Sequence, residues 1–585
     1  EKDEKYRQVI EKYIEYADYL LTKEVATYRY GDKTRMTTDR SIIMALGFAY
    51  NYTGDEKYLK RGYDELYAIT KFPDYDESGM LFASDWAVTL GIGFDWLYNG
   101  LTPEQRDYLS ERMMNHSLKP FAKGYYGRLS GRAGIADDAN FKWISNMCAV
   151  SSTGPFFEAA ALAEYDPDYC FDIMEKCIRA YEYPLALVAP GGGWPEGVGY
   201  WDYAFVYMAS AMLAMKEMCG SYYGLDTAKG FDNMQYAVMA VIGPGGANPV
   251  GDMDATGKIS YEAYNVISRI CNNPLLQSVR VDDILSGTTS VRAMDVIAYT
   301  PFDTETEGSH IAYAPGDEIL TIRENPNPKS DTLYFSTHFG KSSGYHAHLD
   351  TGTFVLDMLG ERWAEDIGRD DYNLQQVLGY KWWDLYRMRA EGHNVLVINP
   401  SADGGQTKGE YTKIEKYDAN DYGGFVTADL SKLYEEANSV KVGYYVDDNM
   451  RSVTVKYEID LPKESEMYWF MHTKASASAD GNKVFLTKNG KSMFMTFDTD
   501  AESLDVSVTD AVPLASSPSV PEQNKNLDYK KVVAHFKGNG KVNFTVKIAP
   551  SGEGISMDEF YKTAIDEWVL PVQKKSVNWS KDLKV

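Results

Sequence analysis

The sequence predicts two large domains, a helical one followed by an antiparallel β-sandwich. At 585 residues the chain is too long for one hydrophobic core. Up to about residue 290 the apolar residues recur at helical spacing. After Tyr299 they alternate, in runs rich in β-branched and aromatic side chains. The polar, turn-rich segment 301–317 separates the two patterns, so we place the domains at 1–300 and 301–585.

The first half is expected to form an all-α toroid or solenoid. Segments of helical period, such as SIIMALGFAYNYTG (41–54) and FFEAAALAEYDPDYC (156–170), follow one another with short polar breaks between them. One helix start is marked by Thr102 and Pro103, with Gln105 close behind. Threonine is a good N-cap and proline suits the first helical position, so we expect a helix from this point.

The second half is expected to form a large antiparallel sandwich. The Asn-Gly pair in KNGKS (488–492) favours a tight hairpin there. From Met557 the segment MDEFYKTAIDEWVL has a short helical pattern that we expect to pack back on one of the domains. The strand pattern recurs in the runs 318–325, 331–339, 352–359, 451–461, 466–472, 483–497 and 541–550.

Composition limits the classes of partner. With 85 acidic and 59 basic side chains, the net charge is −26, which argues against nucleic acid as a partner. It leaves room for an anionic polysaccharide bound in a locally positive cleft. The 11 tryptophans and 45 tyrosines suit stacking on sugar rings, although core packing explains most aromatic residues equally well. No stretch approaches the roughly 20 apolar residues of a membrane span.

Five cysteines without a C-x-x-C spacing read as buried thiols rather than a disulfide framework. The chain opens on EKDEKYRQVI, without an initiator methionine or an apolar signal segment, so we expect a processed or trimmed form. The cysteines are Cys148, Cys170, Cys177, Cys219 and Cys271.

Half of the chain's eight histidines lie within 56 residues: His338, His346, His348 and His393. In GYHAHLD (344–350), residues i and i+2 of an extended segment face the same way, so His346 and His348 should project together. Asp366 and His393 can complete a set of two histidines and one carboxylate, which suits zinc or another divalent ion. Spacing alone does not separate such a site from a hydrogen-bonded polar pair.

The series GYHAHLD, GERWAEDIG and YRMRAEGHNVLVINP resembles the signature of the heparinase II/III superfamily of polysaccharide lyases. The resemblance covers essentially the whole chain, because that family has an (α/α) helical toroid followed by an antiparallel β-sandwich. It implies a structural metal, zinc or alternatively manganese or calcium, held by His348, Asp366 and His393. It implies that His346 points into a cleft as a catalytic or substrate-orienting residue. It further implies a bacterial protein that is secreted, periplasmic or at the cell surface.

Two passages of the helical half carry the rest of the resemblance. DDANFKWISNMCAVSS (137–152) and PGGGWPEGVGYWDY (190–203) resemble the N-N-W-N-type helix start and the E-G-x-x-Y motif of toroidal lyases. Such a lyase must neutralise a uronate carboxylate before the carbon-5 proton can leave. Asn140 matches the neutraliser and Tyr200 the acid/base. Asn140 also suits a helix N-cap, and Tyr200 suits core packing in a glycine-rich turn.

Further side chains are expected to contact the substrate. Arginines that precede the Asn140 passage can hold a carboxylate or sulfate bidentately, although solvated surface arginines fit the same pattern. The only histidine of the helical half, His116, lies in an ordinary amphipathic pattern, which favours asparagine over histidine as neutraliser. The expected substrate-binding residues are Arg128, Arg132, Trp194, Glu196, Trp201 and Arg389.

The sequence therefore predicts a lyase that cleaves uronic-acid-containing polysaccharides by β-elimination and leaves unsaturated ends. A glycosaminoglycan of the heparan, chondroitin or hyaluronan type is favoured, with alginate or another polyuronate as the alternative. A toroid glycoside hydrolase and a non-catalytic glycan-binding protein remain open as well. The hydrolase would use carboxylates from the set Asp95, Asp137, Asp138 and Glu196.

Overall fold

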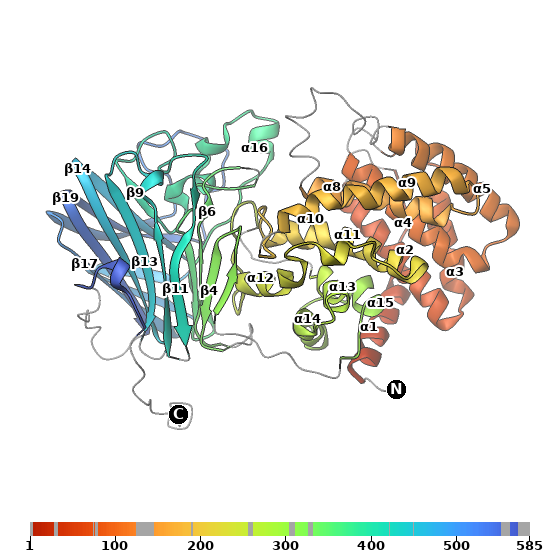
Figure 1. Cartoon of the computed structure of the whole chain (residues 1–585), viewed down its shortest axis with the longest axis horizontal. Helices are drawn as coiled ribbons and strands as arrows, with labels where there is room; N and C mark the ends of the chain where they lie inside the picture. The colour runs from red at the N-terminus through yellow and green to blue at the C-terminus, as the bar shows by residue number, and fades with distance from the viewer. Residues whose placement is uncertain are drawn as a thin grey trace. The chain divides into compact units, whose positions relative to one another are not determined.

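In the computed structural model the chain forms two compact units, one helical and one built from β-strands (Figure 1). The helical unit comprises Glu1–Met239 and Lys258–Glu307, and the β unit comprises Ala240–Gly257 and Gly308–Val585. The chain therefore contributes residues 240–257 to the β unit, returns to the helical unit for residues 258–307, and belongs to the β unit from residue 308 onward. The structure describes residues 4–28, 33–73, 75, 80–123, 145–188, 191–254, 261–302, 311–325, 331–344, 346–420, 422–447, 450–550 and 562–570.

The helical unit is a closed ring of helices, the predicted toroid. Helix α4 packs between α2 and α8, and α11 packs between α8 and α13. Both α13 and α2 contact α15, which closes the ring. The main helices are α1 (Glu4–Leu20), α2 (Lys33–Thr53), α3 (Glu56–Ile69), α4 (Met80–Leu97), α5 (Pro103–Met113), α8 (Asn146–Ala161), α9 (Pro167–Ala180), α10 (Glu182–Val188), α11 (Val198–Cys219), α12 (Met234–Val241), α13 (Ala263–Ile270), α14 (Leu275–Leu285) and α15 (Ala293–Ile297).

The predicted start of α5 is confirmed in detail. The Thr102 hydroxyl accepts a hydrogen bond from the Gln105 backbone at 3.3 Å, and the Gln105 side chain accepts one from the Thr102 backbone at 2.9 Å. This reciprocal capping box satisfies two backbone donors that a helix start leaves unpaired. Pro103 holds the first helical position, as expected.

The β unit contains a five-stranded and a ten-stranded antiparallel sheet. The first has the order β3-β4-β5-β7-β8, and the second the order β11-β12-β13-β14-β19-β17-β16-β15, with β9 on β14 and β18 on β19. The strands are β3 (Ile311–Ala314), β4 (Ile319–Arg323), β5 (Tyr334–His338), β7 (Phe354–Met358), β8 (Glu361–Ala364), β9 (Leu396–Ile398), β11 (Ile414–Asn420), β12 (Gly423–Asp429), β13 (Ser439–Asp447), β14 (Ser452–Thr473), β15 (Ser476–Asp480), β16 (Lys483–Lys488), β17 (Lys491–Thr499), β18 (Ser503–Asp510) and β19 (Lys530–Pro550).

The two sheets share one hydrophobic core, so the predicted sandwich is confirmed. Phe335 and Phe354 of the smaller sheet are buried in the same cluster as Tyr444, Trp469 and Phe544 of the larger one. The ring centroids of Phe354 and Trp469 are 6.2 Å apart. Burial of this large apolar surface is the main favourable term in folding of the unit.

Three local predictions have different outcomes. The KNGKS hairpin is confirmed, because β16 and β17 pair across Asn489 and Gly490, both with positive φ. The runs 451–461 and 466–472 are one strand, β14, with a register shift between Leu461 and Ser465. The described part of the predicted tail helix, residues 562–570, contains the 3₁₀ turn Ile565–Glu567 and no α-helix, and Trp568 is buried against Phe425 and Tyr445.

Candidate functional site

The segment that carries the paired histidines is a turn between β6 (Gly340–Lys341) and β7, not a strand. His346 has a φ of 60°, a left-handed conformation that is rare for residues other than glycine. This backbone turn breaks the alternation expected of a strand. As a result His348 is completely buried, whereas the His346 side chain is 17% exposed.

A buried cluster forms around His348. Potential ligand atoms of His348, Asp350 and His393 all lie within 4.8 Å of one another. Each imidazole contacts a carboxylate on the opposite side of its ring. His348 Nε2 lies 2.9 Å from Asp252 Oδ1, and His393 Nδ1 lies 2.9 Å from Asp366 Oδ2. A carboxylate accepts hydrogen bonds, so it favours the tautomer in which the contacting ring nitrogen carries the proton.

The cluster fits a divalent metal ion. Within the described part of the chain, His348 Nδ1 and His393 Nε2 are buried without a hydrogen-bond partner. Asp350 Oδ1 is buried as well and lies 3.4 Å from His338 Nδ1. Leaving such atoms unsatisfied costs about 1–3 kcal/mol each, which a bound cation would offset. Two imidazole nitrogens and a carboxylate oxygen are ligands that zinc accepts. His348, Asp350 and His393 are therefore the residues that could hold a metal.

The position of Asp366 differs from the set that the resemblance implied. Its Oδ2 accepts a hydrogen bond from Thr353 Oγ1 at 3.0 Å in addition to its contact with His393. Its Oδ1 accepts one from the Gly368 backbone at 3.0 Å. Both oxygens of Asp366 thus have partners of their own, and the carboxylate whose oxygen lies near the two imidazoles is that of Asp350. The physical reason is orientation, because Asp366 approaches the Nδ1 edge of the His393 ring.

Neighbouring charges set the protonation of the cluster. Burial alone would raise the pKa of Asp350, but His338, His393 and His348 hold it well below its usual value. Burial lowers the pKa of His393, but Asp366 and Asp350 outweigh burial and raise it overall. Asp350 is therefore an ionised carboxylate, the form in which it can ligate a cation.

Asn394, the residue after His393, forms hydrogen bonds with both sheets. The Asn394 amide donates hydrogen bonds to the backbone oxygens of Phe354 and Glu365, at 2.7 and 2.8 Å. Its oxygen accepts one from the His472 backbone at 2.7 Å. Burial lowers the pKa of His472, so its ring is neutral and accepts a hydrogen bond from the Tyr386 hydroxyl at 2.7 Å. This framework gives His393 a fixed position.

In the helical unit Tyr200 is the third residue of α11 and is partly exposed. The helix begins after Gly197, whose φ of 85° suits glycine, and the preceding loop is tied to α8. The loop residue Glu196 is 6% exposed and accepts hydrogen bonds from Asn146 at 2.9 and 3.0 Å. It also accepts one from Trp194 Nε1 at 3.2 Å.

Four residues expected to bind substrate are instead buried inside the protein. Trp194 and Trp201 pack against Phe205, at centroid distances of 5.6 and 5.4 Å. Glu196 is engaged by Asn146 and Trp194, as described. Arg389 is 3% exposed, contacts Glu391 Oε1 at 3.2 Å, and donates to three backbone oxygens at 2.6–2.9 Å. These contacts and the burial of all four side chains are typical of residues that pack inside the protein.

Some predicted site residues lie outside the described residues, and some residues of the candidate site were not predicted. Asn140, Arg128 and Arg132 lie outside the described residues. Two residues of the candidate site were not singled out from the sequence as ligand or partner, Asp350 and Asp252. Asp350 had a signal, since it completes the H-x-H-x-D pattern, whereas Asp252 lies far from the histidines in the sequence.

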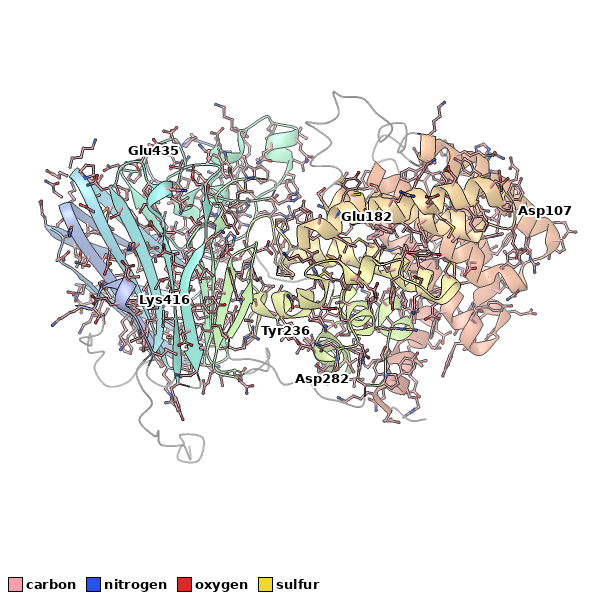
Figure 2. All side chains as sticks on the ribbon, viewed as in Figure 1. Asp107, Glu182, Tyr236, Asp282, Lys416 and Glu435 are labelled. Carbon is pink, nitrogen blue, oxygen red and sulfur yellow. The ribbon has the colours of Figure 1, made fainter. Side chains whose placement is uncertain are left out.

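Acidic side chains are exposed on both units. Figure 2 labels Asp107, Glu182 and Asp282 of the helical unit and Glu435 of the β unit, all exposed. The described residues contain no helix that is long and apolar enough to cross a membrane.

Comparison with known proteins finds a similar domain over part of the chain and similar folds over nearly all of it. Residues 329–579 match the model of the heparinase II/III-like C-terminal domain. Heparinase III is similar in structure, with a TM-score of 0.61 and 12% identity over 92% of this chain and 85% of that chain. The heparan sulfate lyase HepC from Pedobacter heparinus gives 0.56 and 14% over 94% and 84%. No curated protein sequence matches the chain.

A ring of helices followed by an antiparallel sandwich is thus the fold of the heparinases. The match over residues 329–579 agrees with the resemblance carried by the histidine motifs, which lie in the same part of the chain. The β unit is therefore similar to the heparinase II/III-like C-terminal domain, and the chain as a whole has the fold of these solved structures.

Proposed function

We propose that the protein cleaves a uronic-acid-containing polysaccharide by β-elimination. The observation that supports this most directly is the histidine series of the β unit, which carries the family match and contains a partly exposed His346 beside a buried cluster. A glycoside hydrolase has no use for such a series. One of its candidate carboxylates, Glu196, is also buried and fully engaged by hydrogen bonds.

The proposed chemistry needs three groups. Asn140 would donate hydrogen bonds to the uronate carboxylate and so stabilise the negative charge that develops when the carbon-5 proton is removed. Tyr200 would take that proton and return one to the glycosidic oxygen as its bond to carbon 4 breaks. A double bond forms between carbons 4 and 5. His346 would assist by orienting the substrate or supporting the proton transfer.

We propose that the buried cluster binds one divalent metal ion, preferably zinc, with manganese or calcium as alternatives. When bound, the ion would supply a structural tie among His348, Asp350 and His393. The set in which Asp366 replaces Asp350 is the competing proposal. Removal of each carboxylate separately, followed by measurement of the metal content, distinguishes the two sets.

We favour a glycosaminoglycan as substrate, because the similar structures are described as heparinase III and heparan sulfate lyase. Alginate and other polyuronates are the alternatives within the same fold. Arg128 and Arg132 are proposed to contact the anionic groups of the polymer. Since polymers of this size do not cross a cell membrane, we propose that the protein acts in a secreted, periplasmic or cell-surface location.

The test is incubation with heparan sulfate, chondroitin sulfate, hyaluronan and alginate, each separately, while the ultraviolet absorbance of the new double bond is followed. We expect absorbance to rise with at least one polymer. Reducing ends without absorbance would overturn the proposal in favour of a hydrolase. Binding without any cleavage would overturn it in favour of a glycan-binding protein.

A further inference from the structure

The short segment around Asp252 belongs to the β unit, although the chain returns to the helical unit directly afterwards. Asp252 is 3% exposed. Its carboxylate touches three side chains of the candidate site. Oδ1 lies 2.9 Å from His348 Nε2, and Oδ2 accepts a hydrogen bond from the Tyr372 hydroxyl at 2.8 Å and lies 3.9 Å from His346 Nε2.

The backbone of the same segment holds the histidine turn. The Asp252 amide donates a hydrogen bond to the His346 carbonyl at 2.9 Å, and the Gly251 amide donates one to Asp350 Oδ2 at 3.3 Å. Gly251 has a φ of 61°, and a Cβ placed there would lie 2.2 Å from the His346 oxygen. Only glycine permits this close approach, so the left-handed turn at His346 depends on the segment that packs against it.

The contact with His348 decides which ring nitrogen faces the cluster. A carboxylate at Nε2 requires a proton on that nitrogen, and a neutral imidazole then has its lone pair on Nδ1. His348 Nδ1 is the buried atom without a hydrogen-bond partner among the described residues. Asp366 acts on His393 in a corresponding way, because its carboxylate contacts Nδ1 and leaves Nε2 facing the cluster. The pattern is that of a metal-ligating histidine whose second nitrogen is held by a carboxylate.

We propose that Asp252 is a positioning residue for both histidines. Its side chain sets the tautomer and orientation of His348 as a metal ligand, and its backbone fixes the turn that presents His346. This inference rests on the metal site and the reaction proposed above. Asp252 itself contacts neither the reacting atoms nor the metal.

The simplest competing explanation is that Asp252 only anchors the segment. Asp252→Asn separates the two, because it keeps the size and the backbone hydrogen bond but removes the charge that fixes the tautomer. Tyr372→Phe is the matched control. It removes the other hydrogen bond to the same carboxylate and leaves the contact with His348 intact.

The experiment titrates zinc into the metal-stripped full-length protein against a chromophoric chelator. We expect Asp252→Asn to weaken zinc binding about 10- to 100-fold and Tyr372→Phe to stay within about threefold of wild type. Zinc affinity of Asp252→Asn within threefold of wild type would overturn the positioning role and leave the metal site standing. If wild type binds no zinc, both proposals fall.

A measurement on the unsubstituted protein covers the case in which Asp252→Asn does not fold. With ¹⁵N-labelled histidine, NMR couplings report which ring nitrogen of His348 carries the proton in the zinc-bound form. We expect the proton on Nε2. A proton on Nδ1 would overturn the inference, since that nitrogen would then face the cluster as a donor.

The effect on His346 has its own readout. In the elimination assay with saturating zinc, Asp252→Asn should lower kcat at least about tenfold and leave KM within about twofold, because it disturbs orientation and not a substrate contact. Unchanged kcat would overturn the part of the inference that concerns His346. Absence of activity in wild type as well would instead refute the proposed reaction, while the zinc titration still tests Asp252.

Discussion

The Glu196 carboxylate accepts hydrogen bonds from both the side chain and the backbone of Asn146, each at 2.9 Å. Asn146 is the first residue of α8, and Glu196 precedes the start of α11. This pair therefore joins the beginnings of two neighbouring helices of the ring, next to Tyr200. Glu196, one of the predicted substrate-binding residues, thus links the starts of α8 and α11 close to the proposed acid/base, Tyr200.

Glu196→Gln should destabilise the helical unit by about 1–3 kcal/mol, because the amide nitrogen of glutamine would face the donors of Asn146. Chemical denaturation followed by circular dichroism measures the change. The exposed Asp107→Asn serves as the control and should stay within about 0.5 kcal/mol of wild type. Equal stability of Glu196→Gln and wild type would show that the hydrogen bonds carry no net energy.

Tyr200→Phe should reduce the formation of unsaturated product by about 10²- to 10⁴-fold and leave polysaccharide binding close to wild type. The hydroxyl is the group that moves protons, whereas the ring remains for packing. Absorbance assays and calorimetric binding give the two quantities. Tyr165→Phe, at an exposed tyrosine, is the matched control. Retention of turnover in Tyr200→Phe would remove this residue from the acid/base role.

Removal of metal should lower the melting temperature of the wild-type protein, since an ion that binds only the folded state stabilises it, by about 4 kcal/mol at a concentration 1,000 times Kd. Differential scanning calorimetry before and after chelation, and after zinc is restored, measures the effect. His348→Ala should be insensitive to the chelator. An identical transition in stripped and zinc-loaded wild type would argue against a bound ion.

Glu158→Gln should stabilise the protein at neutral pH but not near pH 4. Glu158 is completely buried, and its carboxylate accepts a hydrogen bond from Ser117 Oγ at 2.9 Å. Burial raises its pKa well above the usual value. The unfolded chain therefore loses this proton first, and stability falls as pH rises above the unfolded pKa of about 4.5. Glutamine imitates the protonated form, so the difference in unfolding free energy should grow with pH. A difference that does not change with pH would refute this account.

Arg389→Ala should cost about 3–5 kcal/mol of stability without a change in KM, because it leaves the buried Glu391 without its cation. Thermal denaturation and steady-state kinetics on the folded fraction measure the two effects. A raised KM with unchanged stability would restore Arg389 to the substrate-binding residues.

The features that the sequence predicted well depend on a few neighbouring residues. The capping box at Thr102 and the hairpin at Asn489 and Gly490 are set by local backbone preferences, which leave a clear pattern. The strand β14 was split in the prediction because Pro462 and the polar residues after it resemble a turn, whereas pairing with β19 resumes at Ser465 after a register shift. Tertiary pairing here overrides a local signal.

The geometry of the candidate site also depends on tertiary contacts that local sequence patterns do not show. The motifs identified His348 and His393, but they could not show which side of each ring faces the cluster. That orientation depends on contacts such as the one between His348 and Asp252, which are 96 residues apart. The left-handed turn at His346 likewise depends on Gly251, a residue of the other sequence half. Long-range contacts of this kind leave no periodic pattern in a single sequence.

Residues 240–257 belong to the β unit although they lie within the first half of the sequence, and this affects how the protein can be cut into fragments. A fragment that starts at residue 308 would contain every histidine of the cluster but lack Asp252 and Gly251. Swapping whole halves between relatives at a single junction would combine a histidine turn from one protein with a supporting segment from another. The functional boundary is therefore discontinuous in sequence, and a chimera preserves the site only if both pieces are transferred together.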